Sequence, residues 1–242
     1  MKKLHWSLLK RLNRLRSRFG IYSRLNRKWM LDNRNWVDQQ LIIRRPYEVD
    51  QLARCRHFIR DHHLQYFFDI GANFGLYSIL LSDEQDLLYF HAFEPLPRNV
   101  HQFGANLYLN GLDDRVSLHN YALSDRCGQI EIFIDPCSTG VSTLLPSEAR
   151  DRQTAYKTSM QIESRVFDEA FSFTGIRALV KMDVEGAELL TLAGMSHFLQ
   201  NNLVVLQVET MVQNLDQVEA LMQQAGYRAL GRLGADAYYG NI

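Results

Sequence analysis

Leucines and a phenylalanine recur every three or four residues near the N-terminus, at Leu4, Leu8, Leu12, Leu15 and Phe19. This spacing predicts an amphipathic helix over residues 4–19. A second helix is predicted over residues 47–63, with Pro46 just before it, where a proline is tolerated.

From residue 66 onward, short apolar runs alternate with helical patterns. Predicted core strands cover residues 66–70, 87–93, 115–119, 178–182 and 203–208. Predicted helices cover residues 74–81, 97–109, 187–193 and 215–225. Further strands are expected at 129–134 and 159–165, on either side of a polar stretch at 136–157, and a closing hairpin at 227–239.

This alternation predicts an α/β fold with a doubly wound, mostly parallel sheet and a C-terminal antiparallel hairpin. Residues 1–45 are expected to form a helical N-terminal extension, and residues 46–242 to form the single folded domain. In such folds, ligands bind beyond the carboxyl ends of the strands.

A glycine-containing loop follows the first core strand, with the sequence Asp69-Ile-Gly71-Ala-Asn73-Phe-Gly75. Gly71 permits a sharp turn, and Gly75 permits close approach of the backbone to a ligand or a strand. Asp69 can accept hydrogen bonds from a cationic amino group. Glu94, at the end of the next strand, is placed to accept the hydroxyl groups of a ribose.

The sequence of this loop distinguishes between two classes of nucleotide-binding enzyme. A dinucleotide-binding loop has the pattern G-x-G-x-x-G, whose backbone amides bind pyrophosphate, whereas this loop lacks the middle glycine. Two acids beside a glycine turn suit a nucleoside without phosphate better than they suit a dinucleotide with its pyrophosphate. A nicotinamide-dependent oxidoreductase is therefore kept as the less favoured alternative.

Six segments carry a resemblance to a known family: FFDIGANFGLYS (67–78), FHAFEPLPRNV (90–100), NLYLNGL (106–112), YALSD (121–125), VKMDVEGAELLTLAG (180–194) and VLQVET (205–210). On these segments the chain resembles the FkbM-type S-adenosylmethionine (SAM)-dependent methyltransferases. The resemblance implies a class I methyltransferase fold of Rossmann-like type. It also implies SAM as cofactor and O-methylation of a sugar or of a natural product.

By matching position, the resemblance implies that the SAM contacts are Asp69, Gly71, Asn73, Gly75 and Glu94. Asn120, at the end of the third core strand, is a further candidate, facing the adenine. Ser138–Thr143 is a candidate wall of the acceptor pocket, although hydroxyl-rich loops also form ordinary turns.

Asp183 is the expected catalytic base, at the end of the fourth core strand, with Glu185 and Glu188 as alternatives. Lys181 lies on the same strand face as Asp183, because side chains alternate along a strand. It could keep Asp183 ionised or bind an acidic acceptor. Glu188 has a plainer interpretation as a carboxylate at a helix start. No metal site is predicted, because the acids have no second set of ligands.

The formal net charge is zero, but residues 1–45 carry 13 Lys and Arg against two Asp, which is +11. The predicted N-terminal helix could lie on an anionic membrane surface or pack on its own domain or on a second subunit. Cys55, Cys127 and Cys137 form no CxxC pair, so a reduced, cytoplasmic location is expected, with the inner membrane surface as a peripheral contact.

The expected partner is a small-molecule or glycan acceptor of polysaccharide or natural-product biosynthesis, and homo-oligomers are not excluded. Nucleic acid is not expected, because the basic residues are not interleaved with stacking aromatics around the predicted site. A non-catalytic binding protein on a methyltransferase scaffold is the third alternative.

Overall fold

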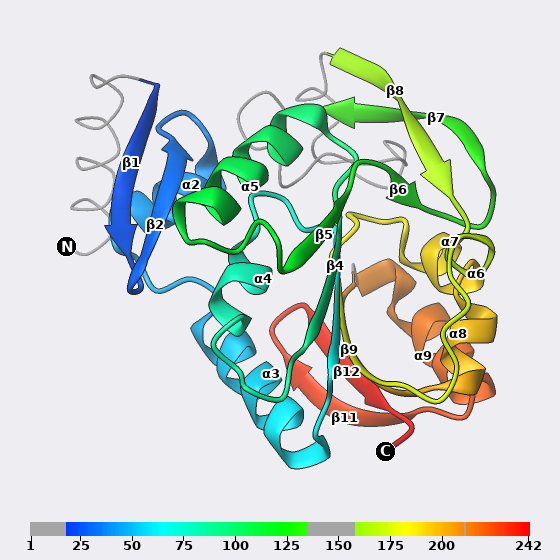
Figure 1. Ribbon diagram of the computed structural model, residues 1–242. Coiled ribbons are helices and arrows are strands. Elements are labelled where there is room, and N and C mark those ends of the chain that lie inside the picture. The colour runs from blue at the N-terminus through cyan, green and yellow to red at the C-terminus, as the bar shows by residue number, and fades with distance from the viewer. Residues whose placement is uncertain (1–17, 135–157, 211) are drawn as a thin grey trace.

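A computed structural model of the chain describes residues 18–134, 158–210 and 212–242 (Figure 1). Its centre is a seven-stranded sheet in the order β11-β12-β10-β9-β3-β4-β5. The parallel strands are β3 (Tyr66–Ile70), β4 (Tyr89–Phe93), β5 (Val116–His119), β9 (Arg177–Met182) and β10 (Leu203–Glu209). The C-terminal hairpin of β11 (Arg228–Leu233) and β12 (Asp236–Gly240) is antiparallel, and β12 pairs with β10.

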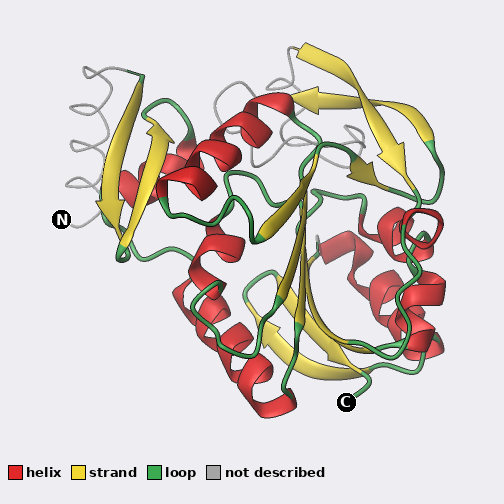
Figure 2. Cartoon of the chain, viewed as in Figure 1, coloured by secondary structure: helices red, strands yellow, loops and turns green. Residues whose placement is uncertain are grey.

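Helices cover both faces of this sheet (Figures 1 and 2). One face carries α3 (Val49–His62), α4 (Leu76–Leu81) and α5 (Pro97–Leu109). The other carries α6 (Phe167–Ala170), α7 (Glu188–Ala193), α8 (Ser196–Asn201) and α9 (Leu215–Gln224), which follows a short 3-10 turn, η3 (Val212–Asn214). Each face has its own core of buried apolar side chains. The predicted doubly wound sheet is therefore confirmed.

The predicted boundaries hold to within a few residues, and the differences have local causes. Helix α4 begins at Leu76 rather than at Phe74, because Gly75 has a left-handed φ of 90° and Asn73 one of 52°. Three short helices, α2, α6 and α8, were not predicted. Each has seven residues or fewer, which is too short for a clear apolar period.

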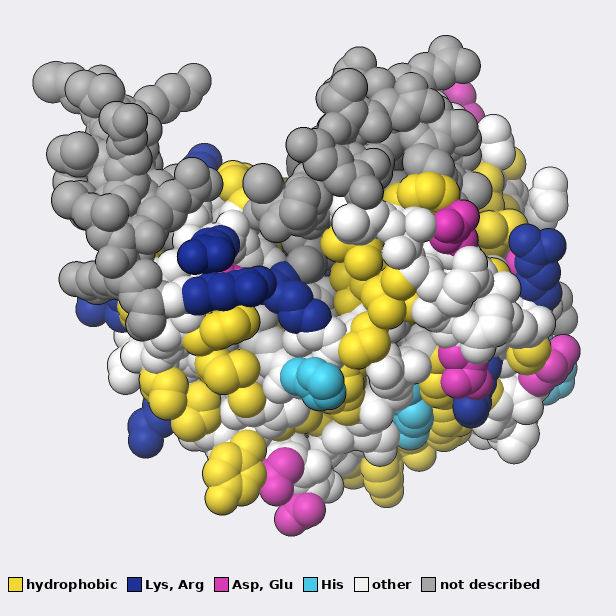
Figure 3. All heavy atoms as spheres, turned by 90° about the horizontal axis from the view of Figure 1, so that it is seen from above, with side chains coloured by type: hydrophobic (Ala, Val, Ile, Leu, Met, Phe, Trp, Pro, Cys, Tyr) yellow, Lys and Arg dark blue, Asp and Glu magenta, His cyan; other side chains and the backbone are white. Residues whose placement is uncertain are grey.

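A second sheet stands over the carboxyl ends of the core strands. It contains β6 (Ala122–Leu123), β7 (Gly128–Ile134) and β8 (Thr158–Arg165) in the order β6-β8-β7. Its small apolar cluster includes Leu96 from the loop before α5. This sheet therefore packs on the segment that follows β4, at the edge where ligands bind in such folds. Figure 3 looks onto this side of the molecule.

We expected the N-terminal extension to be helical, but its described part also contains two strands. Residues 4–17 of the predicted helix lie outside the described residues, and Phe19 begins a strand. Strands β1 (Phe19–Arg24) and β2 (Arg27–Asp32) form an antiparallel hairpin, followed by helix α2 (Trp36–Ile42). The two turn residues have φ values of 51° and 57°, as in the tight turns that match the twist of paired strands. The predicted helix ends at Phe19, where β1 begins, and the rest of the region up to residue 45 was assigned to a helical extension, so this hairpin was not predicted.

The hairpin is fixed to the main domain by side chains of α5. The Asn106 carboxamide accepts a hydrogen bond from the Met30 amide at 2.7 Å and donates to the Phe74 carbonyl at 3.0 Å. Trp29 is fully buried and meets the Phe74 ring edge-on. Thus the hairpin shares the core of one sheet face. No helix in the described part of the chain is long and apolar enough to cross a membrane.

Replacement of Trp29 by Ala should destabilise the whole domain by about 3–5 kcal/mol, because it removes a fully buried aromatic side chain. Urea unfolding followed by circular dichroism should show one transition with a lower midpoint. Tyr108→Ala is the control, since Tyr108 is 76% exposed and its loss should change stability by no more than about 0.5 kcal/mol. A separate early transition, with the main midpoint unchanged, would show that the hairpin unfolds independently.

Candidate functional site

The turn after β3 brings the ends of β3, β4 and β9 together. Gly71 has a φ of 79°, and its amide donates to the Phe93 carbonyl at 3.0 Å. The Asp183 amide donates to the Ile70 carbonyl at 2.9 Å. A Cβ atom on Gly71 would stand 1.8 Å from the Asp183 carbonyl oxygen. Only glycine fits at this position, for both its backbone angle and its space.

Glu94 binds this turn from the end of β4. Its Oε2 accepts a hydrogen bond from the Asn73 amide at 2.8 Å, and its Oε1 accepts one from the Leu96 amide at 2.8 Å. The side chain is 4% exposed. Burial raises the pKa of Glu94 to about 7, although the two amide hydrogen bonds favour the ionised form. Glu94 therefore shapes the loop and also presents a carboxyl group to the adjacent cavity.

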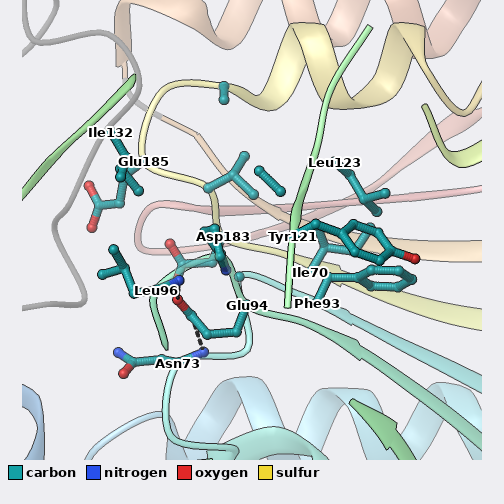
Figure 4. Close-up of a pocket in the computed structure, with 15 residues that line it drawn as sticks. Ile70, Asn73, Phe93, Glu94, Leu96, Tyr121, Leu123, Ile132, Asp183 and Glu185 are labelled. Atoms are coloured by element: carbon teal, nitrogen blue, oxygen red, sulfur yellow. Dashed lines mark hydrogen bonds between the residues drawn. The ribbon is translucent and has the colours of Figure 1, made fainter. Parts of the chain in front are cut away.

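A cavity lies between this turn, the Glu94 loop, β6 and the end of β9 (Figure 4). The space between its walls, including the part open to solvent, is about 640 Å³. Apolar and aromatic side chains form most of the wall: Ile70, Phe93, Leu96, Tyr121, Ala122, Leu123, Ile132, Val184 and Ala187. Gly71, Asn73, Glu94, Asp183 and Glu185 are the polar or small members. This is an apolar slot with carboxyl groups, and the described residues that line it include no Lys or Arg.

Three of the expected cofactor residues do not line the cavity. Each instead makes contacts that support the loops and helices around it. Asp69 is buried beneath it, where its Oδ2 accepts hydrogen bonds from the Ser78 hydroxyl at 2.6 Å and the Ser78 amide at 3.1 Å. Gly75 makes room for the Phe103 ring, which a Cβ would approach to 2.1 Å. The exposed Asn120 donates to the carbonyls of Glu94 and Pro95, each at 3.0 Å.

The expected direct contacts of these three residues with SAM stay a prediction, while their contacts within the protein are structural. Asp69 joins β3 to α4, Gly75 joins α4 to α5, and Asn120 holds the backbone around Glu94. Each residue is required by the geometry of the loop, so a sequence motif alone does not distinguish it from a ligand contact. Of the expected cofactor residues, the structure brings Gly71, Asn73 and Glu94 together in the cavity.

The expected catalytic residues gather at the end of β9. The Lys181 ammonium donates to Asp183 Oδ2 at 2.9 Å and is 6% exposed. Burial alone would lower the pKa of Lys181, but the carboxylates of Asp183, Asp69 and Glu209 raise it above its usual value. Lys181 is thus a permanently charged group behind Asp183, as expected from strand alternation.

A second cavity, whose space including the part open to solvent is about 300 Å³, adjoins the first and shares residues with it. It is lined by Asp183, Glu185, Glu188, Glu209, Thr210 and Ala235. Asp183 and Glu185 line both cavities. Glu185 has a left-handed φ of 48°, an uncommon conformation for this residue type that is often found at functional sites.

Glu188 makes a local contact of the kind expected at a helix start, and its alternative role as catalytic base stays a prediction. Its Oε1 accepts a hydrogen bond from the Gly186 amide at 2.8 Å, which is a local contact at the start of α7. It also lines the second cavity, although it is almost completely buried. Burial raises its pKa. Within the described ranges, no group of three or more His, Cys, Asp or Glu is arranged to hold a metal ion.

Glu209 and Tyr121 are site residues that the sequence analysis did not single out. Glu209 ends β10, next to β9, and the nearby Asp183 carboxylate together with burial raises its pKa to about 9. An acid at the end of the neighbouring strand was a usable signal for it. Tyr121 lies between the end of β5 and the start of β6, so the carboxyl end of a core strand was also the usable signal for it. Ser138–Thr143 and Cys137 lie outside the described residues.

The chain was then compared with known proteins. The family model described as Methyltransferase FkbM domain matches residues 69–229. This match covers well over half of the chain. The chain belongs to the FkbM methyltransferase family. The family assignment makes SAM the cofactor and sets aside the nicotinamide alternative.

Relatives agree with this assignment. Methyltransferase sdnD from Sordaria araneosa is 29% identical over 189 residues, which are 66% of this chain and 72% of that protein. The crystal structure of methyltransferase FkbM from Methylobacillus flagellatus KT superposes with a TM-score of 0.50 at 14% identity. That match covers 74% of this chain but only 44% of the other, so this FkbM chain spans less than half of it. The expected class I methyltransferase fold is confirmed.

Gly71→Ala should destabilise the FkbM domain by about 3 kcal/mol or more, since it adds a steric clash to an unfavourable φ. It should also abolish SAM binding in isothermal titration calorimetry. Gly175→Ala is a matched control, with a φ of 73° and no atom within 4 Å of the added Cβ. It should cost about 1–2 kcal/mol and leave SAM binding intact. Equal effects of the two changes would contradict the close contact with Asp183.

Glu94 should make stability depend on pH. Its pKa is raised from 4.5 to about 7 in the folded state, so the fold favours its protonated form. The SAM-free protein should therefore lose about 2–3 kcal/mol relative to Glu94→Gln between pH 5 and pH 8. Urea unfolding of both proteins at the two pH values measures this difference. Parallel pH dependences would show that Glu94 is not desolvated.

Proposed function

We propose that this protein transfers the methyl group of SAM to a hydroxyl oxygen of an acceptor, a sugar of a glycan or glycolipid or a natural product. The observation that carries the proposal is that Asp183 and Glu185 line two adjoining cavities. One cavity suits a nucleoside, and the other is rich in groups that accept hydrogen bonds from hydroxyls.

The first cavity has the donor and acceptor set that SAM requires. Glu94 uses one lone pair of each oxygen for the loop, and a carboxylate has about four acceptor positions, so ribose hydroxyls can still donate to it. Phe93, Tyr121 and Leu123 offer apolar faces to a purine. When bound, SAM supplies an activated methyl group on a sulfonium.

Asp183 is the group that receives the proton of the acceptor hydroxyl. The Lys181 ammonium at 2.9 Å stabilises its negative charge, and Lys181 itself is held by several carboxylates. Burial and the nearby Asp183 carboxylate raise the pKa of Glu209, whereas the Lys181 ammonium hydrogen-bonds directly to Asp183. A base in this position contributes roughly 10²–10⁴-fold to a rate.

The second cavity supports a hydroxyl-rich acceptor. Its walls offer the carboxyl groups of Glu185, Glu188 and Glu209 and the hydroxyl of Thr210. Such groups orient an acceptor that has several hydroxyls, and orientation of the reacting atoms can contribute on the order of 7–11 kcal/mol. A sugar ring fits this description better than a single alcohol.

The proposal is tested with SAM that carries a deuterated methyl group. The purified protein is incubated with saccharide and lipid extracts, and mass spectrometry identifies components that gain the label on oxygen. Asp183→Asn should reduce transfer to the identified acceptor by about 10²–10⁴-fold, because it removes the base. Its affinity for SAM should not change.

Asp113→Asn is the matched control, since Asp113 is exposed in the turn before β5, away from both cavities. It should transfer methyl groups at the rate of the unaltered protein. A product labelled on nitrogen or carbon would contradict the proposed O-methylation. If no component gains the label, the protein is a binding protein on a methyltransferase scaffold.

A further inference from the structure

An arginine-rich pocket lies where the N-terminal hairpin meets the start of α5. It is lined by Arg18, Asp32, Arg34, Asn35 and Arg98, and encloses about 490 Å³ including its open side. Figure 3 shows Lys and Arg side chains gathered on this side of the molecule, which is also the side of the proposed site. Neither cavity described above shares a residue with this pocket.

Asp32 occupies the base of the arginine-rich pocket and neutralises part of its charge. Its Oδ2 accepts from Arg98 Nη2 at 2.6 Å and from Arg18 Nε at 3.0 Å, and its Oδ1 accepts from the Arg34 amide at 2.8 Å. The carboxylate is only 1% exposed. Two guanidinium groups therefore bind one carboxylate, and the three arginines and one aspartate that line the pocket carry a formal net charge of +2.

Two of the arginines retain unused hydrogen-bond donors. Arg98 Nε is buried and has no hydrogen-bond partner among the described residues. The exposed Arg34 guanidinium likewise has neither an ion pair nor a hydrogen bond within the described part of the chain. A buried donor without a partner is costly, and guanidinium groups bind tetrahedral oxyanions with parallel hydrogen bonds. The arginine-rich pocket therefore has both the charge and the donors of an oxyanion site.

The start of α5 connects this pocket to the proposed cofactor cavity. Leu96 lines the cofactor cavity, and Arg98, two residues later, lines the arginine-rich pocket. Asn99, which follows Arg98 in the chain, forms a side-chain hydrogen bond to Glu94. Residues two positions apart are about 3 Å apart along a helix axis, so a ligand that extends across the first turn of α5 would contact both places.

We propose that the arginine-rich pocket binds a phosphate group carried by the methyl acceptor, so that the acceptor is a phosphorylated compound. This inference rests on the proposed function and extends it, because it identifies the charge of the acceptor. Arg34 and Arg98 provide the hydrogen bonds to the phosphate, and Asp32 keeps the guanidinium of Arg98 in place.

A substitution of Arg34 can distinguish a role of the pocket in ligand binding from a role in stability. Arg18 and Arg98 are ion-paired to Asp32, so removing either would disturb the join between the hairpin and α5. The side chain of Arg34 has no such bond to lose. Arg34→Gln should therefore leave the stability of the protein unchanged while it weakens phosphate binding.

Isothermal titration of the SAM-saturated protein with inorganic phosphate tests this. Arg34→Gln should weaken phosphate binding by about tenfold or more, as expected for the loss of a charge-assisted hydrogen bond. Arg232→Gln, which removes an exposed arginine on β11 at the far edge of the sheet, should bind phosphate normally. Both variants should retain full affinity for SAM.

The inference is overturned if the unaltered protein does not bind phosphate, or if Arg34→Gln binds it equally well. Sedimentation with phosphatidylglycerol vesicles distinguishes a lipid headgroup from a soluble acceptor. Binding to vesicles that requires Arg34, and that phosphate does not displace, would assign the pocket to a membrane and overturn the acceptor role. None of these measurements uses methyl transfer, so a failure of the proposed O-methylation would be seen separately.

Discussion

The contact between Gly71 and the Asp183 carbonyl is the constraint on which the rest of the site depends. The backbone of the turn after β3 lies so close to the end of β9 that no side chain fits between them. Because of this contact, Asp183 and Glu185 after β9 form part of the wall of the cavity beside the turn. A wider separation would place Asp183 away from the cavity that contains Glu94.

A buried positive charge organises the acids around that contact. Lys181 lies among Asp69, Asp183 and Glu209, and these carboxylates more than offset the burial that opposes its charge. The same ammonium is 5.1 Å from the centre of the Tyr77 ring. Removing one partner of such a buried group is costly, since the remaining charges lose their compensation. The arrangement therefore fixes the positions of acids that would otherwise repel one another.

The N-terminal hairpin changes the interpretation of the basic N-terminus. Residues 18–45 were expected to belong to a helical extension, but they are packed against α5 and share one of the two cores. Three of their neighbouring charges, those of Arg18, Asp32 and Arg34, face the start of α5 rather than a separate surface. The described part of this region is thus structurally coupled to the helix that follows Glu94.

Most of the fold and part of the site could be predicted from local pattern. The strand at 66–70 and the helix at 97–109 have the predicted ends, because a continuous apolar run and a proline-to-glycine span are strong local signals. The motif DxGxxxG predicted the glycine turn, and the end of the next predicted strand placed Glu94 at the same edge of the sheet. The motif did not distinguish Gly71 and Asn73, which line the cavity, from Asp69 and Gly75, which support it.

The sequence by itself determined the order of strands and helices, the positions of the turns and the family, since these depend on residues that are close together in the chain. Tertiary structure alone decided that Glu209 and Asp183 share one cavity, that Tyr121 lines the other, and that Arg98 meets Asp32 and Arg34. Glu209 is 26 positions from Asp183, and Arg98 is 66 positions from Asp32. Their proximity follows from the way that buried surfaces pack, and packing is not encoded in any short sequence motif.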